Sequence, residues 1–265
     1  MTSSQDLWFR RYHPAPAART TLYCFPHAGG AATYFHPMSA MMAPEFDLVA
    51  VQYPGRQDRL AEPLVASITE LADRIAAEFD AERGAREERT GEPDGPTAFF
   101  GHSMGAIVAF EVALRLQDSR RPGPAVLFAS GCRAPSRVRD DGVHLRGDEG
   151  VVEELRSMGG TDSRVLSEPE LLAMLLPAMR NDYKAIETYR QTANAQITAP
   201  IAVLAATDDL RVTMEEARAW HGHTTAGGAA HFFDGGHFYL EAQAPAVVGI
   251  VTDELRAATV AGWVA

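Results

Sequence analysis

Apolar residues fall along this chain in runs of two kinds, which predict alternating strands and helices. Six short runs are almost wholly apolar and do not alternate strictly; they cover 20–25, 46–53, 97–101, 125–130, 201–205 and 229–233. Strands of this kind are buried on both faces, as in a parallel sheet. Between the second and third runs, apolar residues recur at helical spacing instead, at Leu64, Ile68, Leu71, Ile75 and Phe79. The pattern predicts an α/β fold with a mostly parallel central sheet flanked by helices.

The segment 134–196 interrupts this alternation, because it has no convincing strand. Helical runs are predicted at 149–157, 168–179 and 182–192. We expect Gly159-Gly160 and Pro177 to separate these helices. An insertion of helices between two strands of a sheet is typical of a lid over an active site. We therefore expect 134–196 to form a helical lid.

The rest of the chain predicts no second domain. A last helix is expected at 245–258, and the charged stretch 84–95, which carries Gly and Pro, is expected to be a surface loop. The chain has 265 residues, of which 46% are hydrophobic, enough for one large core. We find no internal repeat and no low-complexity tract. We expect one domain, 1–265, that carries the lid.

Charge, cysteine count and hydropathy limit the partners and the cellular compartment that we expect for the protein. A formal net charge of −11 argues against nucleic acid as a partner. No uncharged apolar run reaches the ~18 residues that span a bilayer, and the first residues do not resemble a signal peptide. Cys24 and Cys132 both fall beside predicted strands, where buried reduced thiols are common. We expect a cytoplasmic protein without a membrane segment.

One predicted strand runs directly into a Gly-x-Ser-x-Gly turn, which carries the candidate nucleophile. The sequence reads Phe99-Phe100-Gly101-His102-Ser103-Met104-Gly105 and continues as a run of helix formers. A serine between a strand and a helix sits on a tight bend that exposes its hydroxyl. The first glycine allows the bend, and the second keeps bulk away from the helix. Ser103 is the predicted nucleophile, and an ordinary glycine-bracketed turn is the alternative.

A serine hydroxyl needs a base to remove its proton, and in this type of hydrolase an acid and then a histidine follow the serine. The last suitable histidine is His237, on a glycine-rich loop after the predicted strand 229–233. Asp208 and Asp209 follow the predicted strand 201–205. Either carboxylate can hold the imidazole in the required tautomer and stabilise its positive charge. The order of these residues, each just after a strand, indicates nucleophilic catalysis.

Six motifs are spread over nearly the whole chain. They are Cys24-Phe25-Pro26-His27-Ala28-Gly29-Gly30-Ala31, Gln52-Tyr53-Pro54-Gly55-Arg56, Phe100-Gly101-His102-Ser103-Met104-Gly105-Ala106, Pro177-Ala178-Met179-Arg180-Asn181-Asp182-Tyr183, Glu187-Thr188-Tyr189 and Gly235-Gly236-His237-Phe238-Tyr239-Leu240. In these motifs the chain resembles type II thioesterases, the stand-alone editing hydrolases of polyketide synthases and nonribosomal peptide synthetases. The first two motifs discriminate best, because general esterases lack that pair. The resemblance implies an α/β-hydrolase fold with a helical lid.

The resemblance also chooses between the two aspartates. The family pattern Gly-Gly-x-x-Asp-Pro-x-Val places Asp209, three residues before Val212, in the catalytic position. This chain has Ala205-Ala206 for the glycines and Leu210 for the proline. Because of this departure, Asp208 stays an alternative acid.

A tetrahedral intermediate carries negative charge on the former carbonyl oxygen, and backbone N–H groups must face it. One donor is expected from Met104, directly after the nucleophile. The resemblance implies that Ala28 supplies the other, with Gly29 and Gly30 letting its loop approach the substrate closely. The alternative is that Gly29-Gly30 is only a turn that ends a strand.

The resemblance implies that Ser103, with His237 as general base and Asp209 as the orienting acid, hydrolyses thioesters. The substrates would be stalled acyl groups, often short, on the phosphopantetheine arm of acyl or peptidyl carrier proteins. It implies a monomer without cofactor or metal. The alternatives are release of the finished chain, general carboxylesterase activity on oxygen esters, and a non-catalytic binding protein that reuses the fold. The intact Ser103, Asp209 and His237 speak against the last.

Four arginines lie close together in sequence after the predicted strand 125–130; they are Arg133, Arg137, Arg139 and Arg146. Carrier proteins of this family are usually acidic, so attraction to a chain of net charge −11 should not drive docking. We hypothesise that these arginines contact the carrier or the phosphate of its arm. A plain solvated surface is the alternative interpretation.

The remaining histidines are expected to serve structure. We expect His27 and His102 to be packing or hydrogen-bonding residues. His221 and His223 resemble a metal pair, but no third ligand stands at a recognised spacing. His231 lies in a predicted strand and is expected to be a core histidine. No phosphate-binding loop is present, so no nucleotide is implied.

Overall fold

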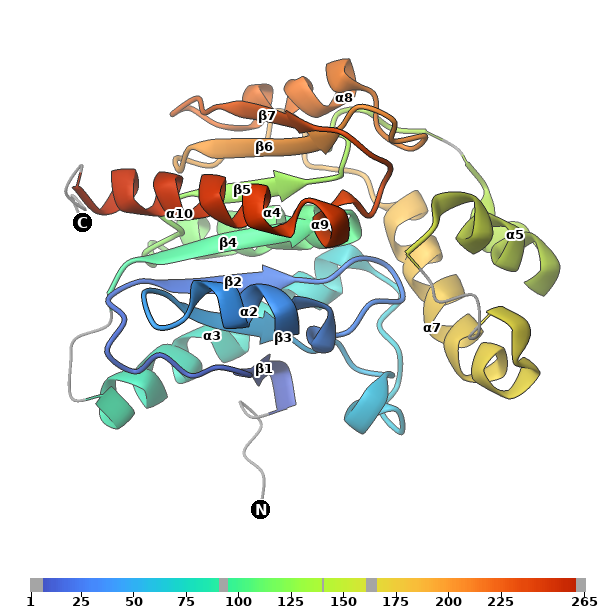
Figure 1. Cartoon of the computed structure of the whole chain (residues 1–265), viewed down its shortest axis with the longest axis horizontal. Coiled ribbons are helices and arrows are strands. Elements are labelled where there is room, and N and C mark those ends of the chain that lie inside the picture. Colours follow the sequence, from blue (N-terminus) through green and yellow to red (C-terminus); the bar gives the residue numbers. More distant parts are fainter. Residues whose placement is uncertain (1–6, 91–94, 140, 161–165, 261–265) are drawn as a thin grey trace.

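A seven-stranded, mostly parallel sheet forms the centre of the fold (Figure 1). The computed structural model describes residues 7–90, 95–139, 141–160 and 166–260. The strands are β1 (Phe9–Arg10), β2 (Thr21–Phe25), β3 (Asp47–Val51), β4 (Thr97–His102), β5 (Leu127–Ser130), β6 (Ile201–Ala206) and β7 (Ala230–Phe233). They lie in the order β1-β3-β2-β4-β5-β6-β7, and only the edge strand β1 is antiparallel. The six predicted strands are confirmed; β1, with two residues, was too short to predict.

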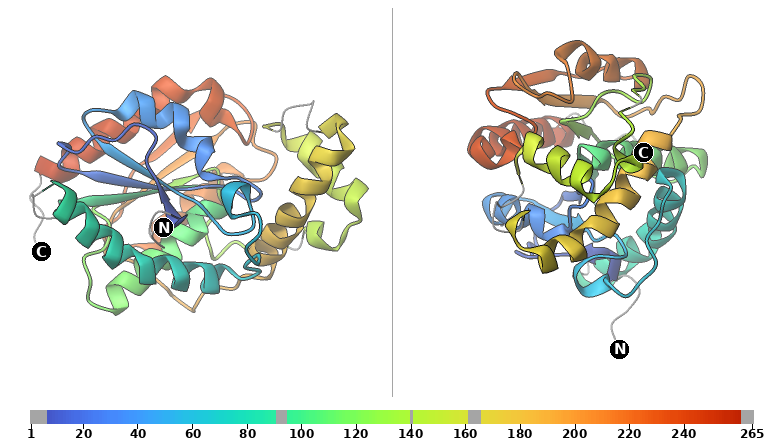
Figure 2. Two further views of the ribbon diagram at one scale, coloured as in Figure 1. Left: turned by 90° about the horizontal axis from the view of Figure 1, so that it is seen from below. Right: turned by 90° about the vertical axis from the view of Figure 1, so that its right-hand side faces the viewer.

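Helices cover both faces of this sheet (Figure 2). One face packs against α2 (His36–Met42) and α10 (Ala244–Val260), and the other against α3 (Ile68–Thr90) and α4 (Met104–Asp118). The shorter helices are α8 (Met214–Arg218), α9 (Tyr239–Ala242) and the 3₁₀ helices η1 (Ala32–Phe35), η2 (Gln57–Arg59), η3 (Val143–Leu145) and η4 (Ala219–His223). The inner strands β2 to β6 are mostly apolar, as expected for strands that helices bury on both faces.

Two sequence predictions about helix boundaries are wrong. The loop expected from Gly84 begins later, because α3 continues to Thr90. Gly84 lies inside this helix, which tolerates it at a modest cost because the neighbouring residues are good helix formers. The break expected at Pro177 is also absent. α7 (Pro169–Thr188) runs through this proline, and buried residues on both sides of it, among them Leu176 and Met179, hold the helix together.

In the described part of the predicted insertion, besides η3, two α-helices lie beyond the arrowheads of the parallel strands (Figure 1). They are α5 (Asp148–Met158) and α7. Between them they bury a small apolar cluster that includes Val151, Leu155, Leu176 and Met179. The carboxyl ends of parallel strands are where α/β folds place their functional loops. The two helices therefore stand beside the end of the sheet at which a site is expected, and their role as a lid stays a prediction.

Candidate active site

Ser103 occupies a sharp turn between β4 and α4. Its backbone has a φ of 53° and a ψ of −123°, which residues with a side chain rarely adopt. The surrounding structure holds the turn, since the Ser103 N–H donates to the Ser130 carbonyl at 2.8 Å. Gly105 is required beside it, because a Cβ there would lie 2.0 Å from the carbonyl oxygen of Phe25. The Gly-x-Ser-x-Gly motif therefore forms the expected bend, and Ser103 lines a cavity.

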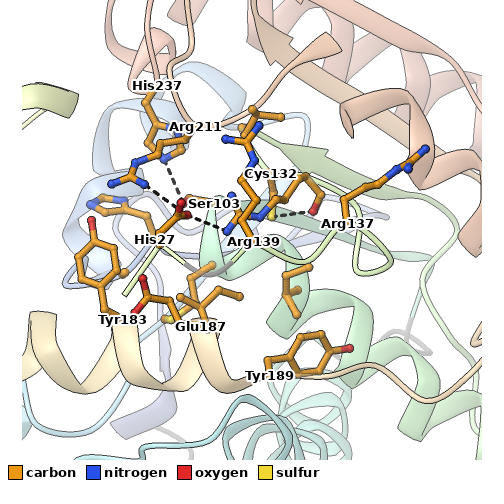
Figure 3. A pocket seen from close by; sticks show the side chains of 18 of the residues that line it. His27, Ser103, Cys132, Arg137, Arg139, Tyr183, Glu187, Tyr189, Arg211 and His237 are labelled. Carbon is orange, nitrogen blue, oxygen red and sulfur yellow. Dashed lines mark hydrogen bonds and ion pairs between the residues drawn. The ribbon is translucent and has the colours of Figure 1, made fainter. Parts of the chain in front are cut away.

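His237 and Asp209 form a hydrogen-bonded chain with Ser103, and Figure 3 shows Ser103 and His237 facing each other. His237 Nε2 lies 3.0 Å from Ser103 Oγ, and its Nδ1 lies 2.9 Å from Asp209 Oδ2. The other oxygen of Asp209 accepts the backbone N–H of Arg211 at 2.7 Å. The Asp209 carboxylate is fully buried. The loops after β4, β6 and β7 thus bring the three predicted residues into the geometry of a nucleophile, base and orienting acid.

Asp208 is placed differently from its neighbour. It is an exposed residue. Its backbone N–H, and not its carboxylate, joins the loop that carries the histidine, donating to the Gly235 carbonyl at 3.0 Å. The geometry therefore favours Asp209 over the alternative that the sequence left open.

Two backbone donors border the cavity beside Ser103, at Ala28 and Met104. Met104 is the first residue of α4, where helix N–H groups have no intrahelical acceptor and the helix dipole is positive. Within the described residues, the N–H groups of Ala28 and Met104 donate to no protein acceptor. These are the two amides that the sequence predicted for an oxyanion hole, and their placement suits that role.

Three other reactive groups close to Ser103 are held in neutral forms. Desolvation, and secondarily the proximity of His237, lowers the pKa of His27 to about 3 and the pKa of His102 well below its ordinary value. His102 Nδ1 lies 3.0 Å from Ser130 Oγ, the hydrogen-bonding role expected from the sequence. Burial raises the pKa of Cys132 to about 12, so its thiol is a poor nucleophile at neutral pH. None of them competes with Ser103 and His237.

Helices α5 and α7 supply part of the cavity wall, and the segment after β5 supplies more of it. Tyr183 and Glu187, labelled in Figure 3, come from α7. Ile186 also comes from α7, and Met158 comes from the end of α5. Glu187 is not available to a ligand, because it accepts the N–H groups of Val143 and His144 at 2.8 and 3.0 Å. The sequence motifs contained Tyr183 and Glu187, and the segment was expected to cover the active site, but the sequence did not indicate which of its side chains face Ser103. That relation depends on how the helices pack onto the sheet.

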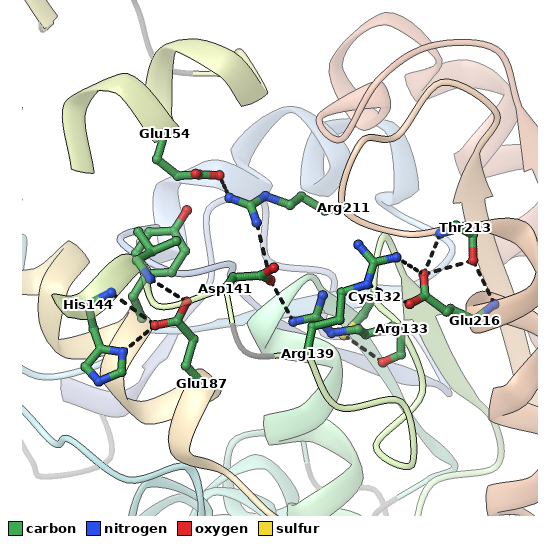
Figure 4. A network of polar contacts seen from close by, with 12 residues as sticks. Cys132, Arg133, Arg139, Asp141, His144, Glu154, Glu187, Arg211, Thr213 and Glu216 are labelled. Carbon is green, nitrogen blue, oxygen red and sulfur yellow. Dashed lines mark hydrogen bonds and ion pairs between the residues drawn. The ribbon is translucent and has the colours of Figure 1, made fainter. Parts of the chain in front are cut away.

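The arginines singled out in the sequence form ion pairs around the cavity mouth (Figure 4). The pairs are Arg133 with Asp141, Arg139 with Glu216 and Arg146 with Glu154. Arg211, which the sequence did not single out, joins them by contacting Asp141 at 3.3 Å and Glu154. Four arginines share three carboxylates in this group, so most of its positive charge is neutralised and it is not an open basic patch.

Arg137 differs from the other three. Like Arg133 and Arg139 it lines the cavity, but its side chain is the most exposed of the four, at 49%. Its ion pair with Glu215 is long, at 3.6 Å, and the glutamate side chain is 86% exposed. An exposed pair of this kind contributes little and is readily exchanged for another anion. Arg137 is thus the arginine of the four best placed to meet a ligand.

The ring of His223, one of the two histidines that resemble a metal pair in the sequence, is engaged in hydrogen bonds. His223 uses both ring nitrogens, which lie 3.1 Å from the Ala195 carbonyl and 2.9 Å from Ser136 Oγ. In the part of the chain that the structure describes, no group of three or more His, Cys, Asp or Glu residues could hold a metal ion. The prediction of a core position for His231 is wrong, because β7 is an edge strand. Its side chain is 27% exposed and lies 3.4 Å from Glu254 of α10.

Cys24 and Cys132 are both free and buried, which confirms the prediction of reduced thiols. Among the described residues, no helix is long and apolar enough to span a membrane.

Comparisons with known proteins agree on one family. The Thioesterase domain family matches residues 20–255. The chain is 46% identical to the probable cadicidin biosynthesis thioesterase of Streptomyces griseus, over 91% of this chain and 63% of that protein. It is 42% identical to thioesterase PikA5 of Streptomyces venezuelae, over 94% of this chain and 85% of that protein. The chain therefore spans a little under two thirds of the first relative and most of the second.

A solved structure extends the similarity to the fold. The type II thioesterase BorB from the borrelidin biosynthetic cluster is 44% identical, with a TM-score of 0.84. The match covers 96% of this chain and 99% of BorB. At this coverage the match includes the sheet and most of the inserted segment.

Proposed function

Because the chain belongs to the thioesterase domain family, we propose that it is a type II thioesterase of polyketide or nonribosomal peptide biosynthesis. Its substrates are acyl thioesters on the phosphopantetheine arms of carrier proteins, and its task is to remove aberrant or stalled acyl groups. The observation that carries this proposal is the hydrogen-bonded chain from buried Asp209 through His237 to Ser103 at the cavity. A purely ligand-binding protein has no need of that arrangement.

Acylation begins when Ser103 Oγ attacks the carbonyl carbon of the thioester. His237 Nε2 takes the hydroxyl proton, and Asp209 stabilises the resulting imidazolium through Nδ1. The N–H groups of Ala28 and Met104 stabilise the oxyanion of the tetrahedral intermediate. The carbon–sulfur bond then breaks, and the pantetheine thiol leaves with the proton returned by His237. The products of this step are the free thiol and an acyl ester on Ser103.

Deacylation repeats the chemistry with water. His237 removes a proton from a water molecule, which attacks the ester carbonyl in the same oxyanion hole. Collapse of the second intermediate regenerates Ser103 and releases the carboxylic acid. The complete reaction consumes one water and one thioester and yields one acid and one thiol. All its proton transfers use His237 and substrate, so no cofactor or metal is required.

The cavity wall suits an acyl chain of modest polarity. Ile107, Met158, Ile186 and Val212 contribute apolar surface close to Ser103. A methionine side chain is unbranched and adapts to acyl groups of different shape. We place the acyl chain against these residues and the arm toward Arg137, whose guanidinium pairs with the phosphate of phosphopantetheine.

The experiment that tests this function compares one acyl group on three carriers. Propionyl is presented on a carrier protein, on coenzyme A and as the p-nitrophenyl ester, to the wild type and to Ser103→Ala. We expect the highest kcat/KM on the carrier protein, and loss of activity on all three substrates in the variant. Equal or better activity on the oxygen ester would instead assign a general carboxylesterase, and activity that survives in Ser103→Ala would exclude Ser103 as the nucleophile.

A further inference from the structure

Two of the sequence motifs outside the triad meet in a buried ion pair. Arg56 lies in the loop after β3, and Asp182 lies in the second half of α7. Two guanidinium nitrogens of Arg56 donate to the two carboxylate oxygens of Asp182, at 2.7 and 3.0 Å. The side chains are only 7% and 3% exposed. A bidentate pair at this depth fixes both direction and distance between the two segments that carry it.

This ion pair is attached to the loop that contains Ala28, defined here as the oxyanion loop, residues 26–32. The Gly29 N–H donates to Asp182 Oδ2 at 2.8 Å. Arg56 donates to the Gly30 carbonyl at 3.1 Å. The pair therefore binds the N–H of Gly29 and the carbonyl of Gly30, the two residues that directly follow Ala28, and leaves the Ala28 N–H for the cavity.

The residues between β3 and Arg56 hold the two ends of the same loop. The Tyr53 hydroxyl donates to the Pro26 carbonyl at 3.2 Å. The Gln52 side-chain oxygen accepts the Ala32 N–H at 2.8 Å. With these contacts the oxyanion loop is fixed at both ends by one motif, and in the middle by Arg56 and Asp182.

Helix α7 also packs directly on the loop. Gly29 has a φ of +71°, and a Cβ built on it would lie 1.7 Å from Met179 Sδ. Met179 stands three residues before Asp182, which places both on one face of the helix. Packing and a hydrogen bond from the same helix face therefore converge on Gly29. The helix that walls the cavity and the loop that carries an oxyanion donor form a single packed unit.

We propose that Asp182, held by Arg56, is a positioning residue that sets the Ala28 N–H in the oxyanion hole and thereby couples helix α7 to transition-state stabilisation. The inference rests on the proposed thioester hydrolysis and adds a role for residues that touch neither substrate nor triad. Oxyanion donors act only within a narrow range of distance, and a displacement of about 1 Å can cost on the order of 10²-fold in rate. In Asp182→Asn one oxygen becomes an NH2 group, which must face either the Gly29 N–H or a nitrogen of Arg56, so the loop loses one of its supports. Where residue 182 is apolar, the Gly29 N–H loses its acceptor altogether, and in both cases the loop can shift.

The test compares Asp182→Asn with a matched substitution at the opposite end of the sheet. Asp47 begins β3; it accepts Arg11 at 2.9 Å and the Ala15 N–H at 3.2 Å, so its bonding resembles that of Asp182. Each variant loses an ion pair with a buried carboxylate, and with it some thermal stability. On an acyl-N-acetylcysteamine substrate we expect Asp182→Asn to lower kcat by about 10²-fold with KM changed by less than about twofold. We expect Asp47→Asn to keep the wild-type kcat.

A second readout separates positioning from general damage to the site. A trifluoromethyl ketone analogue of the substrate adds to Ser103 and forms an oxyanion, whereas the matching amide binds without reaction. We expect Asp182→Asn to weaken inhibition by the ketone by the same factor as kcat/KM and to leave amide binding unchanged. Parallel loss of both affinities, or full ketone affinity with wild-type kcat, would overturn the proposal.

A double variant guards against a failure of Asp182→Asn to fold. Arg56→Met with Asp182→Leu removes both charges together, so no unpaired charge is buried. It still removes the acceptor of the Gly29 N–H, and we expect the same selective loss of kcat and ketone affinity. A folded double variant with wild-type kcat would refute the inference. Hydrolysis by the wild type, and its absence in Ser103→Ala, establish the proposed function separately, so the two failures are distinguishable.

Discussion

Whether His237 Nε2 can accept a proton depends on the group that faces its other ring nitrogen, Nδ1. Asp209 accepts from Nδ1, so the proton of the neutral ring sits there and Nε2 is free to take the Ser103 proton. Both oxygens of Asp209 are engaged, one by the imidazole and one by the Arg211 N–H. The carboxylate is therefore fixed in one orientation, and the tautomer of the base follows from it.

Asp209→Asn should reverse this tautomer. The asparagine amide donates to Nδ1, which moves the ring proton to Nε2 and blocks the transfer from Ser103. We expect kcat for thioester hydrolysis to fall by about 10³- to 10⁴-fold, while the structure is retained. Steady-state kinetics at neutral pH measure the effect. Asp208→Asn is the matched control on the adjacent exposed residue. An equal loss of kcat in this control would show that the assignment of Asp209 as the acid is wrong.

His102 links the site to the stability of the fold. Burial, with His237 and His27 nearby, lowers its pKa well below the ordinary value of 6.5. In the unfolded chain the same ring takes up a proton as the pH falls below about 6.5, so acid favours the unfolded state. The stability contribution is complete above about pH 6.5 and is lost progressively toward the lower folded-state pKa.

His102→Asn should make stability less sensitive to acid. Urea denaturation of the wild type and the variant is measured between about pH 7 and about pH 4.5. We expect the free energy of unfolding to fall less steeply in the variant, by up to about 1.4 kcal/mol per pH unit, because one proton-uptake site of the unfolded chain is gone. Parallel curves for the two proteins would show that His102 does not carry this linkage.

Glycines at two points of the helices should respond oppositely to substitution. Gly84 lies on the exposed side of α3, where an added Cβ meets no atom within 4 Å. We expect Gly84→Ala to raise the free energy of unfolding by about 0.5–1 kcal/mol, through helix propensity alone. In α4, a Cβ on Gly105 would lie 2.0 Å from the Phe25 backbone, so Gly105→Ala should destabilise the fold and inactivate Ser103. Thermal unfolding of both variants checks the contrast, and destabilisation by Gly84→Ala would mean that α3 ends before residue 84.

At the scale of elements, the sequence predicted the strands of the sheet, because they are buried along their whole length. The parallel strands are apolar on both faces, and their positions followed directly from that pattern. Pro177 and Gly84 misled the prediction because a local preference against helix was overcome by the surrounding helix. Tertiary packing decides such cases, and a single sequence carries no direct record of it.

Across the whole molecule, the triad could be predicted because each member follows a strand, and parallel strands end at one edge of the sheet. The support of the oxyanion loop could not be predicted in this way. Arg56 and Asp182 are 126 positions apart and meet only because α7 packs against the loop after β3. The motifs marked these residues as distinctive, but their partnership is a property of the folded chain.

The net charge of the protein leads to a prediction about its partner. The chain carries −11, and its cavity-mouth arginines are mostly paired with carboxylates, so an acidic carrier meets a surface of like overall sign. The Debye length shortens from about 30 Å at about 10 mM salt to about 8 Å at about 150 mM, which screens this long-range repulsion. We expect kcat/KM on the acyl carrier protein to rise over this range.

The uncharged acyl-N-acetylcysteamine thioester serves as the control, and its kcat/KM should stay constant as salt increases. Arg137→Glu adds negative charge at the mouth, so it should lower kcat/KM on the carrier-bound substrate and steepen the rise with salt, while the small thioester is hydrolysed as before. A carrier kcat/KM that falls steeply with salt in the wild type would contradict this prediction, because contacts between opposite charges would then dominate the encounter. The dependence on ionic strength thus distinguishes a carrier attracted by a local basic surface from one that docks against overall repulsion through short-range contacts.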